Sequence, residues 1–307
     1  MSDSRMRPMT VLAATDGSAC AEVALDLLLS IGWPEGSVIH VVTVVEHADS
    51  PVAPPSPAEA QDHAEREAQV IGGLASEMAK AARKLEPTGA RIETAVLGGR
   101  AASAIVEKAE SVRADLIVVG SRGHGTIGSM LLGSVSAEIS DHAHCPVLVA
   151  RAAHLTHAIL GADGSGYART AEDVVARWPI LANAKIEVVT VAYIDLPWTS
   201  SLALSAYAPS ADYTDTSTEV VAEHQRLADE AAVRLQKAGR QATARVVQGD
   251  PAAELLRVAS ESEADLIVVG THGRTGLRRL FAGSVARNVM VHAPCSVLVV
   301  RETRPLT

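Results

Sequence analysis

The chain has 307 residues, of which 48% are apolar and 21% are charged, as in an ordinary globular protein. This length is typical of about two domains. The formal net charge of −9 argues against a protein that binds the phosphate backbone of nucleic acids, because such proteins usually present a basic face. Only 3% of the residues are aromatic, so the core must be built from aliphatic side chains, as is common in parallel sheets.

The termini and the cysteines favour a cytoplasmic location. The N-terminal sequence MSDSRMRPMT is polar and carries no secretory signal, and no stretch approaches the roughly 18 apolar residues of a membrane helix. Cys20, Cys145 and Cys295 show no CxxC spacing, so reduced, buried thiols are expected. We therefore expect a cytoplasmic protein that binds neither nucleic acid nor membranes.

Three blocks of sequence occur twice, in the same order. ADLIVVGSRGHG at 114–125 matches ADLIVVGTHGRT at 264–275, and HAHCPVLVAR at 142–151 matches HAPCSVLVVR at 292–301. The DGS at 16–18 recurs at 163–165. Because the offsets are nearly equal, the chain is a tandem duplication. We expect one domain at 1–152 and a second at 153–307.

The first half alternates short aliphatic runs with longer helical stretches. In chain order it predicts a strand at 11–14, a helix at 19–30, a strand at 37–45, a helix at 58–85, a strand at 91–96, a helix at 101–110, a strand at 115–119, a helix at 134–142 and a strand at 147–150. This alternation predicts an α/β fold with a parallel sheet, right-handed crossovers and helices on both faces. Ligands of such sheets bind beyond the carboxyl ends of the strands. The loops after 11–14 and 115–119 therefore form the candidate site.

A long loop is expected at 194–218, after the strand that matches 37–45. Its counterpart in the first half, at 46–57, is shorter and rich in proline. Loops of this length are unusual in a compact domain and are often functional. The sequence leaves open whether the longer one is a lid or a surface excursion.

A glycine pattern with identical spacing, Gly-x2-Gly-x9-Gly-Ser, follows the fourth strand of each half. Glycine lets a phosphate approach backbone amides, and the helix after the last glycine offers unpaired N–H groups to an anion. The alternative is a plain strand-to-helix turn. The loop bodies have diverged while the glycine spacing has stayed the same, which favours a phosphate-binding loop. The pattern comprises Gly120, Gly123, Gly133 and Ser134 in the first half, and Gly270, Gly273, Gly283 and Ser284 in the second.

Other motifs for nucleotides and metals are missing from the sequence. There is no GxxxxGK[ST], and no GxGxxG follows the first strand. The eleven histidines are not clustered with other metal ligands, so no metal site of the protein's own is expected. Any Mg²⁺ would arrive with the phosphates of a nucleotide.

These features together resemble the ATP-binding class of universal stress proteins. The resemblance rests on the glycine pattern between an ADLIVVG strand and a CPVLV strand, with DGS after the first strand, and it covers nearly the whole chain. The tandem form is similar to those of mycobacteria and related actinobacteria. The resemblance implies two Rossmann-like domains of the adenine nucleotide alpha hydrolase-like kind. Each would hold a five-stranded parallel sheet of order 3-2-1-4-5, and two chains would associate as a homodimer.

The resemblance also implies a set of ATP-binding residues. Asp16 and Asp163 would lie at the adenosine, although each could instead only shape an Asx-turn. Main-chain groups near Val44 and Val191 would meet the adenine edge. The two glycine patterns would cradle ribose and phosphates, and the contact would continue through the next two residues of each helix, Val135 and Ser136 in the first half and Val285 and Ala286 in the second. Ala286 would lack the hydroxyl that Ser136 offers to a phosphate.

The favoured function is a module that binds ATP and regulates stress responses or growth through protein partners. The alternative is a slow ATPase or phosphotransferase, which needs mainly positioning and charge neutralisation. No catalytic residue is assigned, because no base converges with a nucleophile in the sequence. A structural or chaperone-like protein is the third possibility. The sequence leaves open the partners and whether ADP, AMP or a cyclic nucleotide is the ligand.

Overall fold

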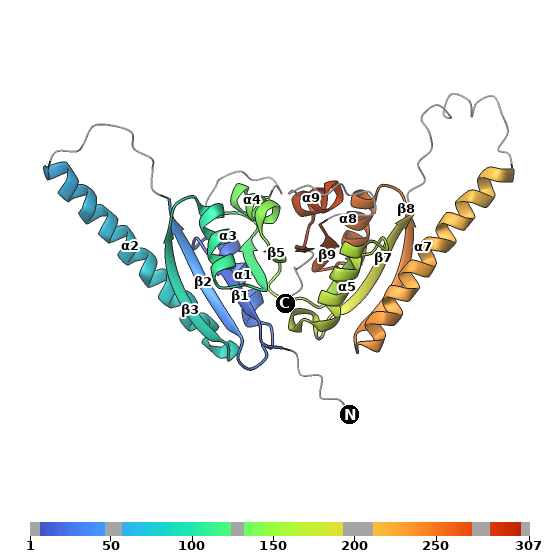
Figure 1. Cartoon of the computed structure of the whole chain (residues 1–307), viewed down its shortest axis with the longest axis horizontal. Helices are drawn as coiled ribbons and strands as arrows, with labels where there is room; N and C mark the ends of the chain where they lie inside the picture. The colour runs from blue at the N-terminus through green and yellow to red at the C-terminus, as the bar shows by residue number, and fades with distance from the viewer. Residues whose placement is uncertain (1–6, 47–56, 124–131, 193–210, 272–282, 302–307) are drawn as a thin grey trace, which may run out of the picture. The chain divides into compact units, whose positions relative to one another are not determined.

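A computed structural model describes residues 7–46, 57–123, 132–192, 211–271 and 283–301 (Figure 1). Side chains are described over the same ranges except at 57–68, 70, 71 and 211–217. These residues form two compact units that divide between His154 and Leu155. Each unit has a parallel sheet of five strands.

The first unit follows the predicted alternation of strands and helices. Its strands are parallel and lie in the order β3-β2-β1-β4-β5, which confirms the expected fold. A 3₁₀ turn, η1, was not predicted. In chain order the elements are β1 (Thr10–Ala14), α1 (Ala19–Leu29), β2 (Val38–Val45), α2 (Pro57–Leu85), η1 (Glu86–Thr88), β3 (Arg91–Gly98), α3 (Ala101–Ser111), β4 (Leu116–Gly120), α4 (Ser134–His142) and β5 (Val147–Ala150).

The second unit repeats this arrangement, with strand order β8-β7-β6-β9-β10. The match between the two halves therefore extends from the sequence to the strand order. Its elements are β6 (His157–Gly161), α5 (Gly166–Arg177), η2 (Pro179–Leu181), β7 (Lys185–Ala192), α7 (Ala211–Lys237), β8 (Gln241–Gln248), α8 (Pro251–Glu261), β9 (Leu266–Gly270), α9 (Ser284–His292) and β10 (Ser296–Val300).

The prediction of a loop over 194–218 is wrong for its last eight residues, because α7 begins at Ala211. Residues 211–218 read ADYTDTST and are weak helix formers on their own. They follow the helical conformation of the next residues, since extending a formed helix is far easier than starting one. Residues 193–210 lie outside the described part of the chain.

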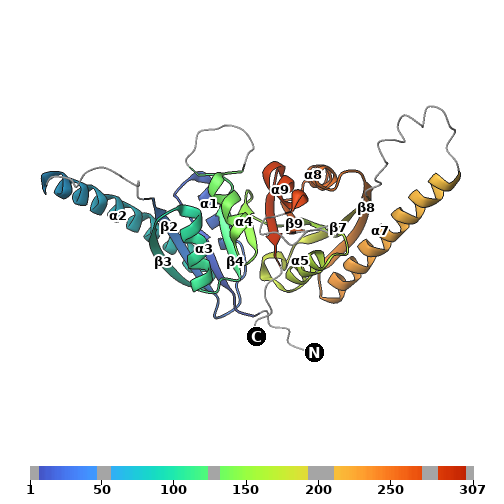
Figure 2. The ribbon, with the colours of Figure 1, turned by 45° about the horizontal axis from the view of Figure 1, so that its top comes forward.

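Helices cover both faces of each sheet. In the first unit, α1 and α2 pack together on one face, and α3 and α4 pack together on the other (Figure 1, Figure 2). The inner strand β4 is buried along its whole length, as its unbroken aliphatic sequence LIVVG predicts. The edge strand β3 is nowhere fully buried. The core therefore lies on the two faces of the central strands, and the loops at the strand ends are left for a site.

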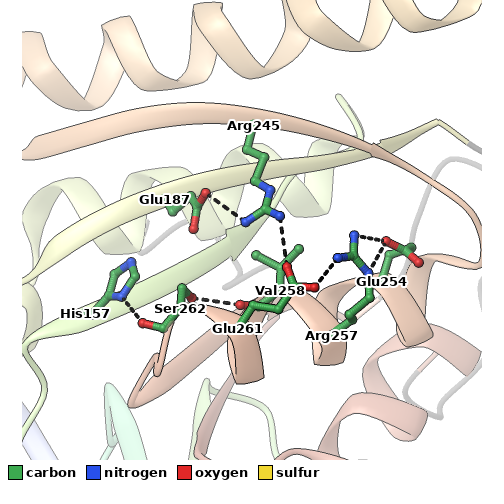
Figure 3. A network of polar contacts seen from close by, with 8 residues as sticks. All are labelled: His157, Glu187, Arg245, Glu254, Arg257, Val258, Glu261 and Ser262. Carbon is green, nitrogen blue, oxygen red and sulfur yellow. Dashed lines mark hydrogen bonds and ion pairs between the residues drawn. The ribbon is translucent and has the colours of Figure 1, made fainter.

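A chain of ion pairs joins α8 to the outer strands of the second unit (Figure 3). Arg245 on β8 has Nη1 3.6 Å from Glu187 Oε1 on β7 and Nη2 3.1 Å from Glu261 Oε2 on α8. Arg257 pairs with both Glu261 and Glu254 along α8. Since most of these groups are partly exposed, each pair adds little to the free energy of unfolding. Their effect is to orient α8 against β8.

Candidate nucleotide site

A cavity of about 540 Å³ lies in the first unit at the carboxyl ends of β1, β2 and β4. This volume is typical of small-molecule sites, and the position is where open α/β sheets bind their ligands. All the site residues predicted for the first half line this cavity: Asp16, Val44, Gly120, Gly123, Gly133, Ser134, Val135 and Ser136.

The walls of the cavity differ in chemistry according to the element that supplies them. The strands β2 and β4 and the helix α3 contribute aliphatic side chains, namely Val42, Val44, Val119, Ala101 and Ile105. The loops after β1 and β4 contribute Asp16 and Arg122, which are the charged residues among the described lining. The cavity can therefore receive a ligand with a flat apolar part and a polar or charged part.

Several of these lining residues were not predicted. Arg122 lies inside the glycine pattern, between Gly120 and Gly123, and its position alone could have drawn attention to it. Ala101 and Ile105 begin the predicted helix after the third strand. Because parallel strands place their carboxyl ends at one edge, the start of every following helix borders that edge.

Asp16 sits in a tight turn between β1 and α1. Its Oδ1 accepts a hydrogen bond from the Ser18 amide at 3.0 Å, so the Asx-turn that the sequence left open is present. Gly17 has a φ of 76°, in the left-handed region that favours glycine. Ser18 then caps α1, with its Oγ accepting from the Ala21 amide at 3.3 Å. The turn holds the carboxylate of Asp16 at the cavity wall.

The glycine at the end of β4 permits a close approach of two backbones. A Cβ on Gly120 would lie 2.7 Å from the carbonyl carbon of Cys20 in α1. This glycine is therefore required by packing, whether or not a ligand binds. The base of the following loop is closed by the Gly133 amide, which donates to the Ser121 carbonyl at 2.8 Å.

Gly133 is the N-cap of α4, and within the described residues no side chain caps the amides of its first turn. Such amides and the helix dipole favour an anion. Ser18 Oγ also contacts the loop, donating to the Arg122 carbonyl at 3.3 Å. The Ser136 hydroxyl donates to the Gly120 carbonyl at 2.7 Å.

The predicted residues of the second half occupy the matching elements. Asp163 follows β6 and its Oδ1 accepts from the Ser165 amide at 3.0 Å, as Asp16 does in the first unit. The Gly283 amide donates to the Thr271 carbonyl at 2.6 Å. Val191 lies in β7, Gly270 ends β9, and Ser284, Val285 and Ala286 form the first turn of α9. Gly273 lies outside the described residues.

The helix after the second strand approaches the two Asp-Gly-Ser turns differently. In the second unit, a Cβ added to Gly164 would lie 3.1 Å from the side chain of Leu227 in α7. In the first unit, a Cβ on Gly17 would meet no described residue within 4 Å. In the second unit Thr190 Oγ1 also donates to the His224 carbonyl of α7 at 3.0 Å. The two turns therefore have different surroundings despite their identical sequence.

Comparison with known proteins identifies the family. The sequence profile of the Universal stress protein family matches residues 9–151 and 155–301, one match in each unit. The chain belongs to the universal stress protein family. Universal stress proteins of Mycolicibacterium smegmatis and Mycobacterium tuberculosis are similar to this chain over stretches longer than one unit. That of Mycolicibacterium smegmatis is 29% identical over 234 residues, covering 70% of this chain and 71% of its own.

The relatives include both long and short chains. A universal stress protein of Mycobacterium tuberculosis is 33% identical over 195 residues, covering 61% of this chain and 62% of its own. One of Bacillus subtilis is 31% identical over 143 residues, covering 47% of this chain and 97% of its own. The crystal structure of a universal stress protein from Archaeoglobus fulgidus superposes with a TM-score of 0.62 at 19% identity, covering 95% of this chain and 98% of its own. This similarity supports the fold.

The described residues of this universal stress protein were searched for metal sites and for membrane-spanning helices. No group of three or more His, Cys, Asp or Glu side chains among them is placed to hold a metal ion. None of its described helices is long and apolar enough to cross a membrane.

Proposed function

We propose that this universal stress protein binds ATP at the carboxyl edge of each sheet and acts as a nucleotide-dependent regulator of stress responses or growth. The observation that carries the proposal is the convergence of every site residue predicted for the first half on one cavity of suitable size. A cytoplasmic location and association with a second copy of the chain belong to the same proposal.

The end of β2 suits the edge of an adenine ring. The β1–β2 ladder ends at the pair Ala14 and Val42, whereas β2 continues to Val45. The Thr15 amide donates a hydrogen bond to the Val42 carbonyl, so the main-chain groups of Val42 face β1. Alternate residues of a strand direct their main-chain groups to the same side. The N–H and C=O of Val44 therefore face the same way, but beyond the end of β1. The aliphatic side chains of Val42 and Ile105 would contact the faces of the ring.

The second unit repeats this geometry. The Ala162 amide bonds the Val189 carbonyl, and the β6–β7 ladder ends at the pair Gly161 and Val189. Val191 therefore directs its main-chain groups past the end of β6, as Val44 does past β1. This repetition supports a second adenine position, at the residue that the sequence predicts.

The phosphates would lie at the start of α4. The amides of Ser134 and Val135 and the helix dipole favour negative charge there, and Arg122 adds a positive charge on the same wall. The Asp16 carboxylate can accept hydrogen bonds from ribose hydroxyls. Asp16 is the one carboxylate among the described lining residues, so Mg²⁺ would be held mainly by the nucleotide's phosphates and water.

The lining also favours binding over rapid turnover. No histidine, lysine or glutamate is present among the described residues of the cavity wall, and Asp16 Oδ1 is already used in its turn. A slow ATPase or phosphotransferase stays the alternative, because phosphoryl transfer depends largely on positioning.

The proposal is tested by denaturing the purified protein with heat and identifying the released nucleotide by chromatography. We expect about two ATP molecules per chain, one for each repeat. Release of ADP, together with repeated phosphate release in solution, would favour the enzyme. No nucleotide in the extract, and none bound on titration, would overturn the proposal.

The variants Asp16→Asn and Asp163→Asn test which of the two units holds the nucleotide. Asparagine keeps the oxygen that accepts from the Ser18 or Ser165 amide but removes the charge. Each variant should lower the nucleotide content of its own unit only.

A further inference from the structure

The hydroxyl of Ser136 bonds a carbonyl at the edge of the cavity. Ser136 lies in the first turn of α4 and is 6% exposed, and its Oγ donates to the carbonyl of Gly120, the last residue of β4, at 2.7 Å. The β1–β4 ladder ends at the pair Ala14 and Val119, one residue before Gly120. Ser136 therefore satisfies a carbonyl that lies beyond the last pair of this ladder.

A second hydroxyl extends this connection along α4. Ser140 is fully buried, and its Oγ donates to the Ser136 carbonyl at 2.8 Å. The Ser140 bond lies within α4, whereas the Ser136 hydroxyl joins the first turn of α4 to the end of β4. A buried hydrogen bond between two elements helps to fix their relative positions.

The second unit provides an internal comparison. Ala286 and Met290 stand at the matching positions, and both are buried. The base of the loop is closed alike in both units, by Gly133 to Ser121 and by Gly283 to Thr271. At these two positions the first unit therefore uses hydroxyls where the second uses apolar side chains.

We infer that Ser136 is a positioning residue, which fixes the start of α4 against the end of β4 and preorganises the phosphate-binding amides of the first unit. This inference rests on the proposed ATP site. A serine hydroxyl has one hydrogen to donate, so donation to a phosphate would remove the bond to Gly120. It would also leave a buried carbonyl without this partner, which is unfavourable. Ser136 thus acts through Gly120 and not on the nucleotide.

The test compares Ser136→Ala with Ser136→Thr in the full chain, with Asp163→Asn present in both to weaken the second site. Ser136→Ala should weaken ATP binding at the first site about tenfold, because the amides lose their preorganisation. Without nucleotide, amide exchange should become faster in 134–142 and stay unchanged in α7 and β8. Ser136→Thr keeps a hydroxyl and should restore both properties.

Two results would overturn the inference. One is a Ser136→Ala protein whose exchange at 134–142 and whose ATP affinity equal those of the parent. The other is unchanged exchange with a loss of affinity for ATP but not for adenosine, which would make the hydroxyl a direct phosphate ligand. If the parent protein binds no ATP, the proposed function fails, while the exchange comparison still decides whether Ser136 positions α4.

Discussion

The carboxylate of Asp16 lies against the Cα of Gly123, so that a Cβ at position 123 would overlap Asp16 Oδ2. These residues come from the loops after β1 and β4, which meet at the cavity. Because the φ of Gly123 is not in the left-handed region, this contact is the feature that distinguishes glycine from alanine at position 123. The contact also joins Asp16, proposed to lie at the adenosine, to the loop that is proposed to hold the phosphates.

Gly123→Ala should therefore displace the Asp16 carboxylate and lower ATP affinity at the first site about tenfold. Because Gly123 is exposed, the free energy of unfolding should change by less than about 1 kcal/mol. A titration with ATP, in parallel with urea unfolding, measures both quantities.

The double variant with Asp16→Asn provides the control. Since both changes act through the same carboxylate, their effects on affinity should be less than additive. Additive losses would show that Gly123 acts independently of Asp16.

Gly120 should respond differently, because its neighbour is rigid backbone. A Cβ there would lie 2.8 Å from the Ala21 amide nitrogen, so Gly120→Ala must shift α1 against β4. We expect a loss of about 2–3 kcal/mol in the free energy of unfolding, as for other overpacked cores.

Gly73→Ala is the matched control for Gly120→Ala. Gly73 lies within α2, where a Cβ would meet none of the atoms that the structure describes within 4 Å. This change should stabilise the protein by about 0.5–1 kcal/mol, because alanine loses less conformational freedom than glycine in a helix. Equal effects of the two substitutions in urea unfolding would contradict the close approach at Gly120.

The alternation of strands and helices could be predicted because it follows a regular sequence pattern, whereas the strand order was expected only from the resemblance to the family. The aliphatic run LIVVG predicts a buried strand, and its recurrence in the second half shows which residues of the two halves correspond. The Ser136–Gly120 bond could not be predicted, since a serine after Gly-Ser fits a phosphate ligand as well as an internal donor. The hydrogen bond becomes visible only in the geometry at the end of β4.

The differences between the halves were also hidden from the sequence pattern. The turns at Asp16 and Asp163 share the letters DGS, yet a Cβ on Gly164 would contact Leu227, whereas a Cβ on Gly17 would contact none of the described residues. Such contacts depend on where a distant helix lies. The start of α7 was placed too late for a similar reason, because its polar first residues take their conformation from the helix that follows.

A partly buried ion pair in the second unit should contribute to stability. Arg234 Nε lies 2.8 Å from Glu172 Oε2, and Glu172 is 6% exposed. Arg234→Ala would leave this carboxylate without its partner, which we expect to cost about 2 kcal/mol, less than for a fully buried pair. The exposed pair Arg177–Asp173 is the control, and Arg177→Ala should change the free energy of unfolding by less than about 0.5 kcal/mol. Equal effects would contradict the burial of Glu172.

His40 should make stability depend on pH. Burial lowers the pKa of His40 below its ordinary value of 6.5, and Lys108 and Arg91 act in the same direction, while Glu93, 3.2 Å away, opposes them. The unfolded chain therefore takes up this proton more readily than the folded one. The contribution of His40 to stability is present above about pH 6.5 and is lost as the pH falls below that value.

The variant His40→Gln removes this titration while keeping a polar side chain. Between pH 7.5 and 5.5, urea unfolding should show a smaller loss of stability for the variant than for the parent. The same loss in both proteins would contradict the role of His40, since the carboxylates are common to both.

Calorimetric titration with ATP decides whether both units bind the nucleotide through the same arrangement. The parent protein, Asp16→Asn, Asp163→Asn and the double variant would be compared. We expect binding to the parent, the loss of one class of site in each single variant, and little binding to the double variant. No binding to the parent at millimolar ATP, or undiminished binding to the double variant, would contradict this expectation.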